Sequence, residues 1–381
     1  MVKAYIVYLM LMSTLVVIWR AKNQTTNEGR QIAHSGDPAI LPMVASVILY
    51  GLLMGLRYDV GGDYLGYVFY YETNTESVQL FETTYELGFY WLIRILHFFD
   101  FPPAALFVAT CTLQMLFMAT WLERNRNIAS WYIFFFFTTL LLFESLNIVR
   151  HALAATIFLA ALPALHERRP FTYVILIVLA TLIHKSAIIL MPLYFILRHD
   201  WLPNRWLQAT LLLFAFVSAP VLKDRLFEFL PWLASSADYD PYSNTQDDLF
   251  FKKEGVSYSP GMFFALIVDL FIIYSSQMLK KNYEKQGFAI YYNLYLVGAL
   301  LGPIVLFSNY IPFSRMIFYF TTIKSVVLAF LVIGWLSTNQ GRKRSGGIPL
   351  TIAIIVAYVV WFLMAIWNEA AHCSPFLFVW D

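Results

Sequence analysis

Hydrophobic positions along this chain form long runs rather than an alternating or one-faced pattern. Twelve runs are of a length that can cross or nearly cross a bilayer. They cover about residues 4–20, 39–56, 104–122, 129–145, 147–165, 171–183, 186–198, 205–222, 260–279, 288–308, 313–336 and 348–368. The pattern predicts an all-α fold, a polytopic membrane helix bundle that forms a single transmembrane domain over residues 1–381.

Two pairs of runs lie unusually close together. Only Leu146 separates the fourth run from the fifth, and the short sixth and seventh runs meet at His184-Lys185. Short segments of this kind are typical of broken helices that line a cavity instead of facing lipid.

A further apolar stretch, residues 85–99, carries Glu86, Arg94 and His97 and decides the topology. It could cross the membrane, or it could be a re-entrant or interfacial helix. The second interpretation is favoured because it places fifteen of the 26 basic residues on one side, as the positive-inside rule requires of the cytoplasm. These residues are Arg20, Lys22, Arg30, Arg124, Arg126, Arg168, Arg169, Arg198, Arg205, Lys280, Lys281, Lys285, Arg342, Lys343 and Arg344. Both chain termini are then expected outside.

This topology brings scattered polar residues to the non-cytoplasmic face. That face receives a loop at 57–84 and the largest loop, at 223–259. The large loop is acidic and aromatic, which suits a carbohydrate better than a lipid tail or a simple ion. Its residues of this kind are Trp232, Asp238, Tyr239, Asp240, Tyr242, Asp247, Asp248 and Tyr258.

Composition excludes several classes of protein. Apolar residues make up 60% of the chain and charged residues 13%, with a mean hydropathy of +0.63, so a soluble globular protein is excluded. Nothing supports a nucleic-acid partner. The two cysteines, Cys111 and Cys373, are too few and too far apart for a disulfide framework or a metal site.

The stretch Arg-Tyr-Asp-Val-Gly-Gly-Asp-Tyr at 57–64 follows the second apolar run directly. Its two glycines permit a sharp bend, so Arg57 and Asp63 can converge on one ligand. The alternative is an interfacial aromatic belt with an aspartate that caps a helix. Both interpretations stay open on this stretch alone.

Three arginines stand at the ends of predicted spans: Arg57, Arg150 and Arg315. An arginine in such a place is costly unless it meets an anion, water or a carbonyl, so each is a candidate functional residue. Two or three guanidinium groups from different helices would hold a pyrophosphate without a metal. The alternative is snorkelling, or pairing with Glu144, Asp59 or Asp269.

Two further features carry candidate chemistry. Asn147, Arg150 and His151 are spaced i, i+3 and i+4, so one helical face would present all three. His184 is expected at a membrane boundary, where burial or a carboxylate could tune it as a general base or as a hydrogen-bond donor to sugar or phosphate. An interfacial histidine without a role is the alternative.

Metal and nucleotide chemistry are disfavoured by the motifs. The sequence has no HExxH and no CxxC, and it has no GxSxG elbow or glycine-rich nucleotide loop. A nucleotide-sugar donor is therefore not expected. A lipid-pyrophosphate donor fits the membrane, the non-cytoplasmic face and the arginines.

Several of these motifs together resemble the EpsG-type branch of the Wzy polysaccharide polymerases. The resemblance rests on Arg57 to Tyr64 with Tyr67, Tyr85-Glu86-Leu87-Gly88-Phe89, Asn147-Ile148-Val149-Arg150-His151-Ala152-Leu153-Ala154, Leu182-Ile183-His184-Lys185-Ser186-Ala187, Arg315 with Tyr319, and Pro375-Phe376. The chain departs from the family pattern at His151, where Gln is more usual, and at Lys185.

The resemblance implies a GT-C-like integral membrane glycosyltransferase in the bacterial inner membrane. It would join undecaprenyl-pyrophosphate-linked oligosaccharide units, as donor and acceptor, at the periplasmic face. It would use no metal or other cofactor, contact membrane lipid, and work beside a chain-length regulator.

The residue roles follow from this resemblance and from the arginines. Asp63 is the first candidate for the catalytic base and His184 the second. Arg150 and Arg315, with Arg57 assisting, would bind the donor pyrophosphate, and loop tyrosines would stack on sugar rings. The full set of expected substrate-binding residues is Arg57, Asp59, Tyr64, Tyr67, Asn147, Arg150, His151, Lys185, Tyr242, Arg315 and Tyr319.

Three other functions remain as alternatives. An O-antigen ligase would use a comparable lipid-pyrophosphate pocket but has a larger outer domain. A flippase for lipid-linked oligosaccharides would expose charge through both halves of the bundle. A membrane O-acyltransferase would need polar chemistry reaching through the membrane to a cytosolic acyl donor.

Overall fold

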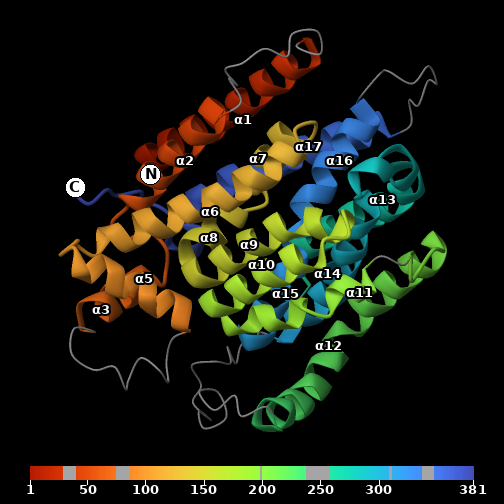
Figure 1. Ribbon diagram of the computed structural model, residues 1–381. Coiled ribbons are helices and arrows are strands. Elements are labelled where there is room, and N and C mark those ends of the chain that lie inside the picture. The colour runs from red at the N-terminus through yellow and green to blue at the C-terminus, as the bar shows by residue number, and fades with distance from the viewer. Residues whose placement is uncertain (29–39, 74–85, 198–199, 237–257, 309–310, 337–346) are drawn as a thin grey trace. The chain divides into compact units, whose positions relative to one another are not determined.

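The computed structural model describes residues 1–28, 40–73, 86–197, 200–236, 258–308, 311–336 and 347–381 (Figure 1). These residues are almost entirely helical, as the long apolar runs predict, and no strand occurs among them beyond one isolated bridge between Arg57 and Phe378. The elements are α1 (Val2–Glu28), α2 (Ile40–Gly55), α3 (Tyr64–Thr73), α5 (Leu87–Phe98), α6 (Ala104–Arg124), α7 (Ala129–Thr138), α8 (Leu141–Asn147), α9 (Val149–His166), α10 (Pro170–Ile183), η2 (Lys185–Leu190), α11 (Leu193–Ile196), α12 (Arg205–Ser236), α13 (Pro260–Asn282), η4 (Glu284–Gln286), α14 (Phe288–Ser308), α15 (Ile311–Thr321), α16 (Ile323–Leu336), α17 (Ile348–Trp367) and η5 (Ala370–His372).

Within the described part of the chain, eight helices are long and apolar enough to cross a membrane, or nine if the bent pair α7–α8 is one span. The protein is therefore a polytopic helical membrane protein, as predicted. The count is smaller than the twelve runs in the sequence because three runs form short helices. The run at 39–56 gives the 16-residue α2, and those at 171–183 and 186–198 give α10 and the pair η2–α11.

Two interruptions shape the polar region of the molecule. The predicted fourth span breaks at Leu140, which has a φ of 66°, and α7 and α8 meet there at 65°. The predicted break at His184 is confirmed, because α10 ends at Ile183 and His184 is extended, with φ −153° and ψ 116°. The backbone groups of an extended residue are not used in helical hydrogen bonds. A broken helix can therefore place these groups and the side chain in a site.

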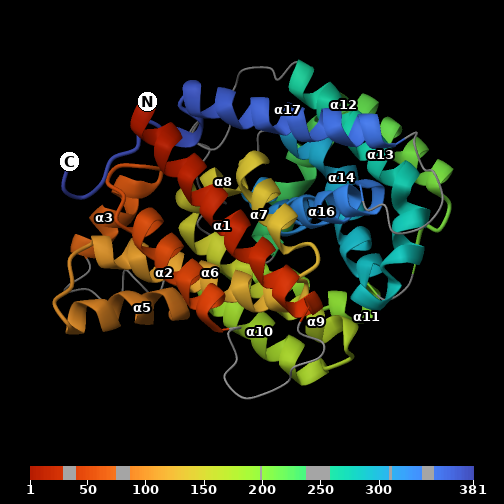
Figure 2. The same cartoon turned by 90° about the horizontal axis from the view of Figure 1, so that it is seen from above.

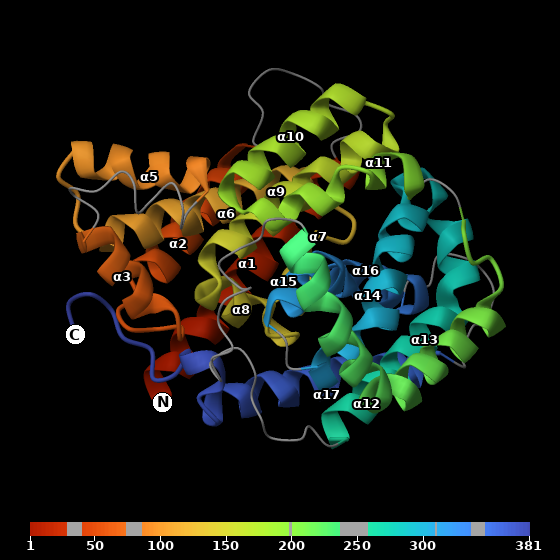
Figure 3. The same ribbon diagram turned by 90° about the horizontal axis from the view of Figure 1, so that it is seen from below.

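Two compact units divide the chain. The first contains Met1–Tyr194 and Leu328–Asp381, and the second contains Phe195–Val327. In the first unit, α6 packs between α2 and α9, α9 packs against α10 (Figure 3), and α1 packs against α7 (Figure 2). Helix α9 is buried along most of its length, because its many alanines allow neighbours to approach from several sides.

The second unit is built around α14. Helix α12 runs along it (Figure 3), and α13 and α15 also contact it. Residues 223–236, expected to begin the large outer loop, continue α12 as helix to Ser236. The remainder of that loop, including Tyr242, lies outside the described residues.

The short helices α3 and α5 follow the sequence motif at 57–64. The expected loop at 57–84 therefore contains a helix, α3, while residues 74–85 lie outside the described residues. Helix α5 has 12 residues, which at 1.5 Å per residue gives about 18 Å, well short of the ~30 Å hydrocarbon core. This length is compatible with the re-entrant or interfacial helix predicted for 85–99.

Candidate active site

Arg57 is fully buried, and its guanidinium donates hydrogen bonds to backbone carbonyls of the protein. Its Nε donates to the carbonyl of Val60 at 3.0 Å, and its terminal nitrogens donate to the carbonyls of Met54 at 2.6 Å and Leu146 at 2.9 Å. A longer contact joins it to the Cys111 sulfur at 3.5 Å. Such an arginine locks the end of α2 to the end of α8, since it satisfies backbone carbonyls that helices leave without partners at their ends.

The turn that follows Arg57 is held from two directions. Gly61 has a φ of +98°, and a Cβ there would lie 2.8 Å from the carbonyl oxygen of Leu146, so this position requires glycine. The Gly61 N–H donates to the carbonyl of His372 at 2.9 Å, and the Asp63 N–H donates to Oδ1 of Asn147 at 2.9 Å. The conformation of the turn thus depends on the C-terminal segment and on the junction between α8 and α9.

The C-terminal segment pairs with the same turn. The N–H of Tyr58 donates to the carbonyl of Leu377, and the N–H of Val379 donates to the carbonyl of Leu56. Lys3 and Asp381 form an ion pair at the two chain termini, which lie close together in Figure 1. The motif at 57–64 is therefore assembled from segments that are distant in sequence.

The predicted sugar-binding tyrosines of α3 are buried in a core cluster. Tyr64 is 2% exposed and stacks on Phe107 with ring centroids 4.2 Å apart. Tyr67 is 9% exposed and contacts Phe89 and Phe107 edge-on. The exposed residues of the motif at 57–64 are Tyr58, Asp59, Gly62 and Asp63. The rings of Tyr64 and Tyr67 therefore pack against the protein and leave little surface on which a sugar could stack.

A cluster of opposite charges lies where α5, α9 and α10 meet. The carboxylate of Glu86 accepts from Arg150 through Oε2 at 2.8 Å, and its Oε1 lies 3.1 Å from Nδ1 of His184. The backbone N–H of Lys185 also donates to Oε1, at 3.1 Å. The Glu86 side chain is 8% exposed, that of His184 10% and that of Arg150 20%. One carboxylate thus joins the two residues predicted to bind phosphate and to act as a base.

The backbone brings these three side chains together in a simple way. Gly88 lies against the carbonyl of Leu182, where a Cβ would come within 2.9 Å of the oxygen. This close approach fixes the start of α5 beside the end of α10, two residues before His184. Because α10 ends there, the Lys185 N–H is free of the helix and can reach Glu86.

His151 lies beside this cluster, but it does not share one helical face with Asn147. The ring of His151 is 2% exposed and meets the ring of His184 edge-on, with centroids 4.6 Å apart. The expected continuous stripe is wrong at Asn147, which belongs to α8 because the chain breaks at Ile148, with φ −89° and ψ 62°. The α8–α9 junction therefore links the Gly61–Asp63 turn to the charged cluster.

Electrostatics keep Glu86 ionised. Burial raises the pKa of its carboxyl, but the hydrogen bond from His184, the charge of Arg150 and the N–H of Lys185 together lower it further, from 4.5 to about 2. Nδ1 of His184 lies 3.1 Å from the ionised carboxylate of Glu86. The carboxylate therefore faces Nδ1 and not Nε2, the second ring nitrogen.

Three predicted residues remain, which are Lys185, Arg315 and Tyr319. The side chain of Lys185 is exposed, although its N–H serves Glu86. Arg315 and the fully buried Tyr319 belong to α15 of the second unit. Among the described residues, no group of three or more His, Cys, Asp or Glu side chains could hold a metal ion.

Glu86 was missing from the sequence-based set of site residues. Its signal was present, since it is a carboxylate at the edge of an apolar stretch and lies within one of the motifs that carry the family resemblance. What the sequence could not show is that α5 folds back against α10. Only that contact turns an isolated glutamate into the partner of two catalytic candidates.

The helical bundle and this cluster define a multi-pass membrane protein in which one buried carboxylate contacts a guanidinium and an imidazole. The chain belongs to the EpsG family, whose model matches residues 40–378, nearly the whole length. Membership supports a polysaccharide polymerase-type, glycosyltransferase-like function in general. Neither the curated proteins nor the solved structures include a significant match to the chain.

Proposed function

We propose that this protein is a glycosyltransferase that polymerises undecaprenyl-pyrophosphate-linked oligosaccharide repeats at the periplasmic face of the bacterial inner membrane. The observation that carries the proposal is the contact of one carboxylate, Glu86, with both Arg150 and His184. Transfer from a lipid pyrophosphate needs a base for the acceptor hydroxyl and a cation for the leaving group. These two groups are adjacent here.

In the proposed reaction, Nε2 of His184 accepts the proton of the acceptor hydroxyl. The hydroxyl oxygen attacks the anomeric carbon of the donor, and the bond from that carbon to the pyrophosphate oxygen breaks. The pyrophosphate leaves with the bonding electrons on its oxygen, and the positive charge of Arg150 stabilises it. Glu86 orients both side chains and stabilises the imidazolium that forms.

The other predicted roles are adjusted by the geometry. His184 is preferred to Asp63 as the base because it has a carboxylate partner, as in catalytic triads. Arg57 takes no substrate role in this mechanism, since its donors serve backbone carbonyls. Arg315 remains a proposed second cation for the pyrophosphate, and Asp59, Asp63 and Lys185 are proposed to line the entrance for the glycan.

The membrane side and the remaining partners are part of the proposal. The distribution of Lys and Arg supports a periplasmic active face. The positive charge of Arg150 would take the place of a metal, so polymerisation should persist in excess EDTA. A GT-C-like fold and a separate chain-length regulator are proposed from the family resemblance.

The test is polymerisation of a defined lipid-linked repeat by purified protein, read as a ladder of products. Glu86→Gln, Arg150→Ala and His184→Gln should each abolish the ladder at normal protein yield. Arg94→Ala is the matched control, because Arg94 is an exposed residue of the same short helix as the Glu86 cap. A full ladder from Arg150→Ala would contradict the pyrophosphate assignment.

A deletion strain separates polymerisation from ligation. Loss of the polymerase should leave a single repeat on the lipid A core, whereas loss of a ligase would leave long unligated chains. Accumulation of long unligated chains would overturn the proposed function in favour of a ligase.

A further inference from the structure

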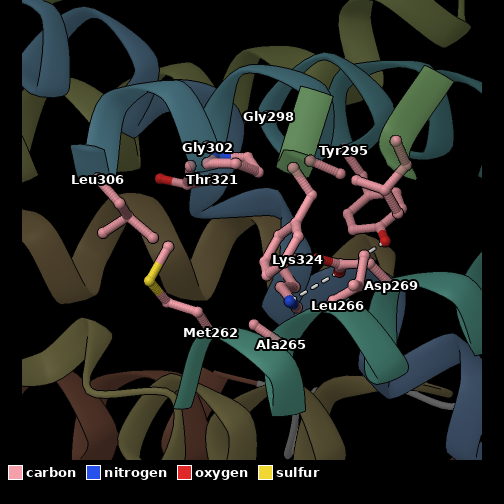
Figure 4. Close-up of a pocket in the computed structure, with 14 residues that line it drawn as sticks. Met262, Ala265, Leu266, Asp269, Tyr295, Gly298, Gly302, Leu306, Thr321 and Lys324 are labelled. Carbon is pink, nitrogen blue, oxygen red and sulfur yellow. Dashed lines mark hydrogen bonds and ion pairs between the residues drawn. The ribbon is translucent and has the colours of Figure 1, made fainter. Parts of the chain in front are cut away.

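The second unit contains a cavity of about 140 Å³ (Figure 4). Apolar side chains form most of its wall, with an ion pair at one end. A cavity of about 150 Å³ is sufficient to bind benzene, so this one has room for a short piece of hydrocarbon. The lining residues used below are Met262, Leu266, Asp269, Tyr295, Gly302 and Lys324.

The polar end is a network centred on Asp269. Its Oδ1 accepts from the Tyr295 hydroxyl at 2.7 Å and lies 2.7 Å from Nζ of Lys324. Figure 4 shows the three side chains converging from separate helices, which are α13, α14 and α16. The side chain of Asp269 is 12% exposed and that of Lys324 is 22% exposed.

These charges lie deep within their helices. Asp269 follows the start of α13, Pro260, by nine residues, and Lys324 follows the start of its span, Phe313, by eleven. At 1.5 Å per residue these separations are about 14 and 17 Å, near the middle of a ~30 Å hydrocarbon core. Ionisable side chains at such depth are costly, so each is a candidate for a functional site.

The chemistry of the cavity selects an uncharged ligand with a hydroxyl group. The Asp269 and Lys324 charges neutralise each other, so a charged ligand would bring an unbalanced charge into a low-dielectric site. Tyr295 and Lys324 both contact Oδ1 of Asp269, so an O–H donor of a ligand can approach Oδ2.

A backbone carbonyl also lines the cavity. Pro303 has no N–H and so cannot donate to the carbonyl of Ala299, and both residues line the cavity.

We propose that this cavity binds a neutral lipid-like alcohol. Its hydrocarbon part would fill the space beside Met262, Leu266 and Gly302, and its hydroxyl would donate to Asp269. Two sources share this chemistry, an isoprenoid alcohol and a straight-chain alcohol such as an acylglycerol. The proposal goes beyond the polymerase function and does not depend on it.

The glycines of the chain offer a matched pair of variants. Gly302 lines the cavity, and a Cβ there would meet nothing within 4 Å, so we expect Gly302→Leu to extend into the cavity. Gly66 in α3 has the same open surroundings but belongs to the first unit, which makes Gly66→Leu the control. Gly298 is unsuitable, because a Cβ there would lie 2.8 Å from the backbone of Phe320.

The experiment is photocrosslinking of the purified full-length protein with photoreactive analogues of farnesol and of dodecanol, with the attachment site located by peptide mass spectrometry. We expect attachment within α13 or α14, suppression by unlabelled alcohol, and at least tenfold less suppression by farnesyl pyrophosphate, because its charge is unbalanced in the cavity. Gly302→Leu should reduce attachment about tenfold or more, whereas Gly66→Leu should leave it unchanged. Asp269→Asn should weaken it about fivefold, the effect of roughly 1 kcal/mol.

Each outcome decides the proposal. Stronger attachment of the farnesol analogue identifies an isoprenoid ligand, and stronger attachment of the dodecanol analogue identifies a straight chain. Attachment elsewhere, equal suppression by farnesyl pyrophosphate, or no effect of Gly302→Leu would overturn it. Because the readout is binding and not polymerisation, failure here leaves the polymerase proposal standing.

Discussion

The turn after α2 and the cluster at the start of α5 each contain an arginine at a helix end, and each was expected to hold the same pyrophosphate. Their surroundings differ. Arg57 is fully buried and donates to three backbone carbonyls, whereas Arg150 is 20% exposed and faces the carboxylate of Glu86.

This difference separates two uses of a membrane-edge arginine. The last carbonyls of a helix have no donor within the helix, so a guanidinium can use all its N–H groups to bind backbone carbonyls. A guanidinium that meets a carboxylate beside a histidine is instead one part of a reactive arrangement. The partner, and not the arginine, tells the two roles apart.

The largest effect should come from the base of the charged cluster. His184→Gln removes the proton acceptor while keeping a polar side chain, so the polymerisation rate should fall by about 10²–10⁴. The amount of folded protein should stay close to wild type, because the glutamine amide can still donate to the carboxylate of Glu86. Single-turnover rates with a lipid-linked repeat, beside detergent-solubilised thermal unfolding, measure both quantities.

Arg57 should show the opposite balance. Arg57→Lys replaces the forked donor by a single ammonium group, leaving carbonyls of Met54, Val60 or Leu146 without donors. Each buried unsatisfied group costs about 1–3 kcal/mol, so the free energy of unfolding should drop by about 3 kcal/mol. Folded Arg57→Lys protein that is stable but inactive would show that Arg57 contacts substrate after all.

Acidification should reveal the coupling at Glu86. The pKa of Glu86 is lowered in the folded protein, from 4.5 to about 2, so its contribution to stability is present above pH 4.5 and is lost as the pH falls toward 2. The unfolding temperature of the wild type should therefore decline between pH 4.5 and 2 by more than that of Glu86→Gln. Parallel curves for the two proteins would contradict the coupling.

The smallest effect concerns the shape of the Arg57 turn. Gly61→Ala places a side chain at a φ of +98° and against the carbonyl of Leu146, which should cost about 1–3 kcal/mol. Gly66→Ala in the adjacent helix should change stability little, because its surroundings are open. Equal unfolding temperatures for Gly61→Ala and Gly66→Ala would show that a side chain at position 61 does not strain the turn.

The same comparison shows how far the sequence leads. The long apolar runs predict the helices, and the break at His184 follows from the polar pair that interrupts two short runs. The buried state of Arg57 could not be predicted, because its acceptors include Leu146, 89 residues further along the chain. The same is true of Tyr64, which a loop pattern presents as exposed and which the fold stacks on Phe107.

The cluster itself was predictable only in part. Arg150 and His184 are conspicuous because they interrupt apolar segments, but their common partner is 64 residues before the first of them. Periodicity describes one element at a time, and the contact between α5 and α10 depends on a close approach at Gly88. Sequence patterns name the chemical groups, and the tertiary contacts decide which of them work together.

The account depends most on Glu86, so the most direct test is polymerisation by purified Glu86→Gln protein, assayed near neutral pH at a temperature where circular dichroism shows it to be folded. Substitution by glutamine keeps the size of the side chain and removes the charge that orients Arg150 and His184. We predict that wild type and Arg94→Ala convert a defined lipid-linked repeat into a ladder and that Glu86→Gln yields none. A full ladder from folded Glu86→Gln protein would contradict the central claim.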